Sequence, residues 1–132
     1  MSATPPPIAE AMKKADVVWI APAGGPRPAP AWLHWTGEAA YVVCGPGEQP
    51  LTGLADATSA TVTVRSPETG ASILCWDADV TAVAPASPTW DEVVPALVLG
   101  RLNAADRRTL ADRWARTATV LRLAPTGEWR RA

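Results

Sequence analysis

Hydrophobic and polar residues alternate along much of the chain, and this alternation is typical of strands that bury one face. The sequence ATVTVR at positions 60–65 places Val62 and Val64 on the face expected to be buried. A longer alternating stretch, Ala71–Val83, places four apolar residues on one face: Leu74, Trp76, Ala78 and Val80. The turn sequence SPETG between the two stretches predicts that they form a β-hairpin.

The aromatic stretch Pro30–Gly47 predicts a second hairpin, around which the chain is organised. Its first half carries Trp32 and Trp35, and its second half, Ala39–Cys44, is rich in strand-forming residues. A Thr-Gly pair between the halves predicts the turn. Because side chains alternate along a strand, we expect at most one of the two tryptophans to point into the core. Two further strands are predicted over Asp16–Ala21 and Thr117–Leu123.

Helical spacing of apolar residues appears first at Ile8–Ala15 and then late in the chain. Thr89 with Glu92 three residues later fits a capping box, and Asn103 with Asp106 predicts the start of a second late helix. The strands thus form an antiparallel run first and the helices cluster late. This order indicates an α+β fold with a closed or partly closed antiparallel barrel of about six strands and two or three helices.

The length of 132 residues corresponds to one domain, which we place at residues 8–124. We expect a flexible proline-rich tail at residues 1–7 and a polar C-terminal tail at residues 125–132. The net charge of −1 gives no basic footprint, so we expect no nucleic-acid partner. No apolar run approaches membrane-spanning length, and we expect no membrane association.

The two cysteines, Cys44 and Cys75, lack the spacing of zinc ligands and lie in apolar runs. The N-terminus lacks the apolar stretch of a signal peptide, so we expect free thiols in a cytoplasmic protein. Seven tryptophans are many for this length. A buried indole N–H requires a partner, which favours positions at a core edge, a cleft or a subunit contact.

No catalytic motif is found in the sequence. His34, the single histidine, has no evident orienting partner, and a structural role is the simpler interpretation. The bend from Gly45 to Gly47 follows a strand, and backbone N–H groups in such a bend can bind a phosphate, although plain turns share this pattern. The arginine-rich late helix is most simply a solvated face.

The segment from Val17 to Gly47 resembles the start of the FMN-binding split-barrel family, the pyridoxamine 5′-phosphate oxidase-like proteins. These chains carry a helix, a strand, a "G-x-P" turn, a "P-x-W-x-x-W" strand and then "G-x-x-Y". The corresponding residues here are Gly25–Pro28, Pro30–Trp35 and Gly37–Tyr41. The resemblance extends over residues 8–123 and implies an antiparallel six-stranded split β-barrel with two or three flanking helices.

The resemblance also implies a homodimer that binds FMN, a deazaflavin coenzyme or occasionally haem at the subunit interface. The "P-x-W" strand of the family lies along the flavin ring, and the bend after "G-x-x-Y" holds the phosphate. The cofactor-binding residues carried over on this basis are Trp32, His34, Tyr41, Gly45, Gly47 and Gln49. Outside these motifs, Arg65 or Arg101 is a candidate phosphate ligand.

The chain departs from the family directly after the bend, where a lysine or arginine is usual and this sequence has Glu48-Gln49. Two hypotheses follow. The first is a flavin- or deazaflavin-dependent oxidoreductase acting on a small molecule. The second is a non-catalytic split barrel without a cofactor, which has lost the phosphate site and binds a small ligand or a partner. No catalytic residue is assigned by either hypothesis.

Overall fold

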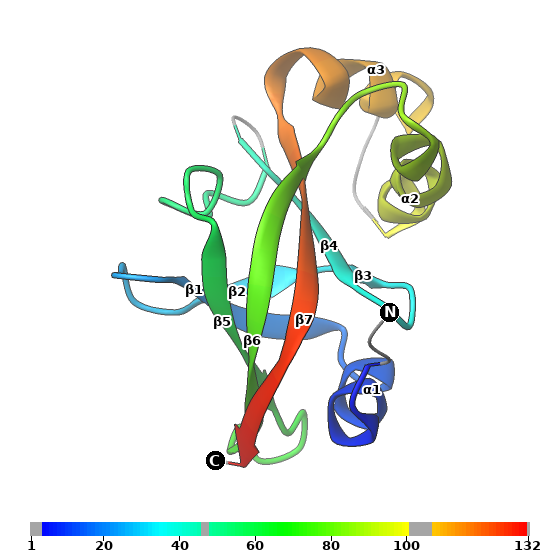
Figure 1. Cartoon of the computed structure of the whole chain (residues 1–132). Helices are drawn as coiled ribbons and strands as arrows, with labels where there is room; N and C mark the ends of the chain where they lie inside the picture. Colours follow the sequence, from blue (N-terminus) through cyan, green and yellow to red (C-terminus); the bar gives the residue numbers. More distant parts are fainter. Residues whose placement is uncertain (1–3, 46–47, 101–106, 132) are drawn as a thin grey trace.

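The computed structural model describes residues 4–45, 48–100 and 107–131. Figure 1 shows a twisted sheet with α1 at one end and α2 and α3 at the other. The elements in chain order are α1 (Pro6–Lys13), β1 (Val17–Pro22), β2 (Ala29–Trp32), β3 (His34–Trp35), β4 (Ala40–Cys44), β5 (Ser59–Arg65), β6 (Ser72–Val83), α2 (Pro88–Leu99), α3 (Arg107–Thr117) and β7 (Thr119–Arg131).

The seven strands form one antiparallel sheet in the order β2-β1-β5-β6-β7-β4-β3. The predicted α+β class with an antiparallel barrel is therefore confirmed, with seven strands where six were expected. The additional strand arises because the run from Trp32 to Trp35 divides at Leu33. Trp32 ends β2, which pairs with β1, whereas Trp35 lies in β3, which pairs with β4.

This division closes the barrel, because β2 and β3 adjoin in the chain and yet form opposite edges of the sheet. A single residue, Leu33, joins the two edges, so the sheet must curl until its edges meet. Curling of this kind follows the natural twist of strands and removes most of the exposed sheet edge. The result is a nearly closed barrel with a seam between β2 and the β3–β4 hairpin.

Gln49 bridges this seam through its side-chain amide. Its Oε1 accepts a hydrogen bond of 2.7 Å from the backbone N–H of Trp32, and its Nε2 donates to the carbonyl of Trp32 at 3.3 Å. The same Nε2 also donates to the carbonyl of Val43 in β4 at 3.2 Å. The amide of Gln49 therefore takes the place of a peptide group in a neighbouring strand and links β2 to β4.

The barrel interior is filled by the apolar faces that the alternation predicted. Val62 and Val64 of β5 are buried there, and so are all four predicted residues of β6. Trp76 is fully buried, and its ring meets that of Trp35 edge to face at 6.1 Å between centroids. Trp35 thus faces the barrel interior whereas Trp32 packs against the opposite side of the sheet, as expected for strand alternation.

A second apolar cluster lies outside the barrel, between the sheet and the helices α2 and α3. Helix α2 begins two residues earlier than predicted: the hydroxyl of Ser87, and not that of Thr89, accepts from the backbone N–H of Trp90 at 3.1 Å. The predicted cap at Asn103 lies outside the described residues. Leu110 and Trp114 of α3 are fully buried, as predicted. None of the helices described here has the length and apolar character needed to cross a membrane.

The last strand is longer than the sequence suggested. β7 continues through Arg131, so the stretch expected to be a polar tail pairs with β6 as far as the contact between Leu74 and Arg131. Pro125 had indicated the end of the strand. It is tolerated because the pairing shifts register beside it, where Asp77 alone lies opposite three residues of β7.

We predict that Trp76→Ala lowers the free energy of unfolding by about 3–5 kcal/mol, because it leaves a large cavity inside the barrel. Urea denaturation followed by circular dichroism measures this value. Trp19→Ala is the matched control, because Trp19 lies on the outer face and is only half-buried. This variant should lose much less free energy of unfolding. Equal losses for the two variants would contradict the assigned faces.

We predict that Gln49→Ala lowers the free energy of unfolding by about 2–4 kcal/mol, because three hydrogen bonds across the seam are lost and backbone groups are left without partners. Hydrogen exchange at the Trp32 amide should accelerate more than exchange in β5 and β6. Thr52→Ala, in the same loop but exposed, is the control. An unfolding free energy unchanged within about 0.5 kcal/mol would show that the seam does not depend on Gln49.

Candidate functional site

A row of polar side chains crosses the outer face of the sheet. The register pairs His34 of β3 with Tyr41 of β4, Tyr41 with Arg122 of β7, and Arg122 with Thr81 of β6. We call these four residues the polar row. The neighbours of Tyr41 and Arg122 along their strands point into the barrel, so the row faces outwards. At about 4.8 Å per strand, the row spans roughly 14 Å.

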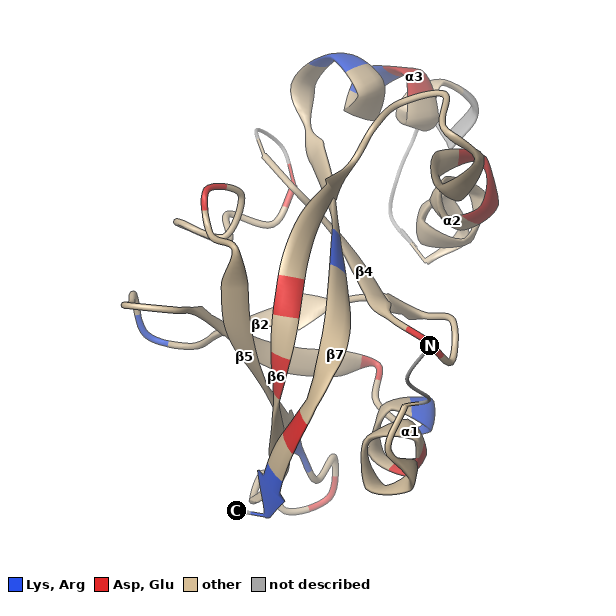
Figure 2. Ribbon diagram, viewed as in Figure 1, with Lys and Arg blue, Asp and Glu red and all other residues tan. Residues whose placement is uncertain are grey.

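Arg122 is the only arginine or lysine of the polar row. Its guanidinium Nε donates to the hydroxyl of Tyr41 at 3.2 Å, and the arginine is half-buried. Within the described part of the chain, no carboxylate lies within ion-pair distance of this guanidinium. Figure 2 shows acidic residues along β6. The register places one of them, Asp79, opposite Ala124, two residues along the strand from the pair of Thr81 and Arg122.

Trp32 and Tyr41 belong to the apolar layer beneath α2 and α3. Tyr41 is 6% exposed, and Trp32 packs against the same cluster while its backbone is bound by Gln49. His34 is half-buried at the sheet edge opposite Tyr41. The structure therefore brings together three of the residues that the family resemblance implied, Trp32, His34 and Tyr41, on one side of the sheet.

The bend after β4 is held by contacts within the chain. The Gly45 N–H donates to the carbonyl of Gln49 at 3.3 Å, and the Glu48 N–H donates to the carbonyl of Gly45 at 2.9 Å. Gly45 has φ +133°, and a Cβ at this position would lie 3.1 Å from Ala118 Cα, so only glycine fits. Gly47 and Arg101 lie outside the described residues. Gln49, which the resemblance implied as a cofactor contact, forms the barrel seam.

Glu48 points towards α3. Its side chain is 1% exposed, and Oε2 lies 3.7 Å from Arg113 Nη2. Arg113 was expected to stay on the solvated face of its helix, and it is instead half-buried beside this carboxylate. The negative charge after the bend is therefore matched by a cation from another element, and the ion pair fixes the bend against α3.

Arg65 lies at the other end of the barrel. Cys44 pairs with Thr119 at the start of β7, while Leu74, the partner of Val64, pairs with Arg131 twelve positions further along. The bulge opposite Asp77 takes up two of these positions, so the ten that remain correspond, at about 3.3 Å per residue, to roughly 33 Å of strand between the two ends. The guanidinium of Arg65 stacks on the ring of Trp19, 4.0 Å from its centroid. Arg65 therefore does not join the bend or the polar row within one chain.

Both cysteines are free, and Cys44 is buried beside the bend. Burial raises the pKa of the Cys44 thiol, which keeps it protonated and inert. The described residues contain no group of three His, Cys, Asp or Glu side chains that could hold a metal ion. The chemistry available on the outer face is thus anion binding by a guanidinium next to phenol, imidazole and indole groups.

Arg122 was missed when the sequence was read alone. The signal was present: an arginine occupies an outward position of the alternating run TATVLRLA, in the middle of a strand and not at its end. What the alternation does not reveal is the partner strand, and it is β4 that places the Tyr41 hydroxyl beside Arg122.

The sequence matches no protein-family model and no curated protein. Among solved structures, the chain is similar to HutZ, the heme storage protein from Vibrio cholerae, with 17% identity, a TM-score of 0.66 and coverage of 98% of this chain and 95% of that one. It is also similar to a Listeria innocua protein provisionally assigned as a pyridoxamine 5′-phosphate oxidase, with 13% identity, a TM-score of 0.65 and coverage of 95% and 94%.

A third similar structure is an F420 reductase, with 18% identity, a TM-score of 0.58 and coverage of 92% of this chain and 94% of that one. At identities this low, similarity shows the fold alone. The likeness nevertheless covers nearly the whole of this chain in all three cases. The chain therefore has the split-barrel fold of the pyridoxamine 5′-phosphate oxidase-like proteins, as its sequence indicated.

Proposed function

We propose that this protein binds a flavin or deazaflavin coenzyme on the outer face of the sheet, at the polar row. The observation that carries this proposal is Arg122, a half-buried residue whose guanidinium has the Tyr41 hydroxyl as its one partner among the described residues. The fold supports the cofactor class, because similar structures include an F420 reductase and a protein described as a pyridoxamine 5′-phosphate oxidase.

A partly buried cation loses hydration, and an anionic partner restores the lost free energy. Flavin and deazaflavin coenzymes carry phosphate groups and a ring that takes up negative charge on reduction, and both suit a guanidinium. Arg122 presents its two remaining nitrogens beyond the bond to Tyr41, and the exposed Thr81 hydroxyl lies on its other side. The donors of the polar row therefore fit an anionic cofactor.

When bound, the coenzyme supplies hydride transfer. The residues of this chain have simpler tasks. Arg122 neutralises the anionic part of the coenzyme, and the Tyr41 hydroxyl fixes the direction of that guanidinium. Trp32 and the apolar layer under α2 and α3 exclude water from one side of the row. The reaction is then an oxidation or reduction of a small molecule.

The proposal includes a homodimer that shares the site. In Figure 1, none of the described helices covers the outer face of β1, β5 and most of β6. Half-buried side chains such as Trp19, Thr63 and Cys75 lie on this face. A second copy packed there would cover them and bring its own arginines towards the row. Two free cysteines support a cytoplasmic location for such a dimer.

A second candidate function is non-catalytic binding of a small ligand without a redox cofactor. It is favoured by one observation: Glu48 and Gln49 stand where the family carries a cation, and both are engaged within the chain, Glu48 with Arg113 and Gln49 with the seam. In that case Arg122 binds an anion other than a flavin phosphate.

We predict that the purified protein binds FMN or a deazaflavin coenzyme, and that Arg122→Gln weakens binding at least tenfold because a charge-assisted contact is lost. Quenching of cofactor fluorescence during titration measures the dissociation constant. Arg122→Lys keeps the positive charge but lacks the planar guanidinium. Its dissociation constant should therefore lie between those of the wild type and Arg122→Gln. The loss should shrink with added salt, since a partly exposed charge contact is screened.

The matched control is Arg130→Gln, which removes another arginine of β7 that is exposed and pairs with Asp77 at 3.4 Å. It should leave cofactor affinity unchanged. If the wild-type chain binds neither coenzyme, the second candidate function replaces the first. If Arg122→Gln and Arg130→Gln weaken binding equally, the effect is one of overall charge and the polar row is not the site.

A further inference from the structure

A cleft of about 470 Å³ lies at the opposite end of the barrel from the bend, between α1 and the β5–β6 hairpin. Its size is that of a small-molecule site, for which about 300–1,000 Å³ is usual. Val64 and Leu74, a cross-strand pair, form its floor, and both are 2% exposed. The end of β7 closes one side through Arg131.

Helix α1 provides a fixed wall. Ile8 and Met12 are buried in the barrel core, and this face anchors the helix. Pro7, Ala11 and Lys14 recur at i, i+4 and i+7, so they share the adjacent face, and all three line the cleft. The wall is therefore apolar along most of its length and ends in an ammonium group.

The opposite wall is also apolar and is partly open to water. Ile73 of β6 lines the cleft and is 40% exposed, one of three large hydrophobic residues with such exposure in the described part of the chain. The hairpin turn that carries this wall is held by the Ser66 hydroxyl, which accepts from the backbone N–H groups of Glu68 and Thr69, each at 3.3 Å. An apolar ligand would cover Ile73 without rearranging the hairpin.

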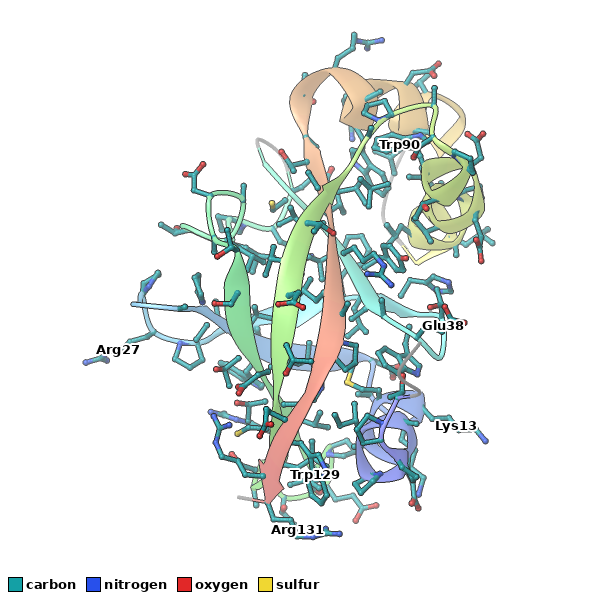
Figure 3. All side chains as sticks on the ribbon, viewed as in Figure 1. Lys13, Arg27, Glu38, Trp90, Trp129 and Arg131 are labelled. Atoms are coloured by element: carbon teal, nitrogen blue, oxygen red, sulfur yellow. The ribbon has the colours of Figure 1, made fainter. Side chains whose placement is uncertain are left out.

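Three cations surround the apolar surface: Lys14, Arg65 and Arg131. Two of them are held over aromatic rings, Arg65 at 4.0 Å from the centroid of Trp19 and Arg131 at 5.5 Å from that of Trp129. Figure 3 shows Trp129 and Arg131 together at the end of β7. Stacking restricts each guanidinium while leaving its N–H groups available for an anion.

The cleft also contains two carboxylates, Glu10 and Glu68. Neither lies within ion-pair distance of the three cations, as far as the described residues show. Three cations and two carboxylates leave one positive charge in the cleft. This balance suits a ligand with a single negative charge better than a dianionic phosphate.

We propose that this cleft binds a small amphipathic carboxylate, with its apolar body on Ile73, Ala11 and the floor and its carboxylate on Arg65 or Arg131. Guanidinium and carboxylate match in a bidentate geometry, which fixes the head of the ligand. The site is separated from the polar row by most of the length of β7, so it does not depend on the proposed cofactor function.

The proposal is tested by titrating the full chain with octanoate and following the Ile73 methyl groups and the Trp19 and Trp129 indole N–H signals by NMR. Saturable shifts confined to these groups and to α1 are expected. Octylamine, which has the same chain and the opposite charge, should bind at least fivefold more weakly. Equal binding of octanoate and octylamine would overturn the proposal, and so would shifts that lie elsewhere in the barrel.

Variants separate the two parts of the site. Arg65→Gln and Arg131→Gln should each weaken octanoate binding, and Ile73→Ser should weaken octanoate and octylamine alike. Matched controls are Arg27→Gln, an exposed arginine that projects away from the barrel in Figure 3, and Leu99→Ser, a leucine that is 70% exposed. Controls that weaken octanoate binding as much as the site variants do would overturn the assignment.

A second copy of the chain is the alternative occupant of the cleft. It would show as Ile73 methyl shifts that change with protein concentration when no octanoate is present, and this result would also overturn the proposal. Ile73 and Leu99 are 40% and 70% exposed, and the three substituted arginines are exposed as well. The variants should therefore fold, which circular dichroism can verify.

Discussion

The structure depends on how the two edges of the sheet are joined. Strands that adjoin in the chain normally pair with each other, but β2 and β3 lie at opposite edges with Leu33 alone between them. Because the sheet curls, Trp32 comes near β4, but its backbone N–H and carbonyl are not paired with backbone groups of that strand. Gln49 supplies both a donor and an acceptor to Trp32 and a further donor to Val43. One side-chain amide thus meets the requirement that buried backbone groups be hydrogen-bonded.

This closure determines where ligand chemistry can occur. The bend after β4 is committed to structure, because Gln49 holds the seam and Glu48 pairs with Arg113. A ligand using these side chains would have to break contacts on which the barrel and α3 rely. On the outer side of the sheet, the pairing of β4 with β7 places Tyr41 and Arg122 side by side. The anion site that we propose therefore lies on the sheet and not in the loop.

What could be predicted from the sequence follows from local physics. Alternation placed Val62 and Trp76 in the core correctly, because a side chain's face depends only on its own strand. Features that depend on a distant partner could not be predicted. β7 continues past Pro125 because β6 is there to pair with it, and the function of Gln49 requires the fold that it closes. Of the residues in the candidate site, Trp32, His34 and Tyr41 came from a family resemblance, whereas Arg122 required the register.

The partners of the arginines give a physical criterion for the surfaces that we propose to bind anions. Arg113 and Arg130 pair with carboxylates, so their charges are largely balanced within the protein. Arg122, Arg65 and Arg131 are instead oriented by a phenol hydroxyl or an indole ring, groups that fix a guanidinium without neutralising it. A guanidinium held in this way keeps its positive charge, so the free energy gained when an anion binds to it is large. The three arginines belong to the polar row and to the cleft beside α1. The two surfaces proposed to bind anions are thus those where the fold orients positive charge and leaves it available.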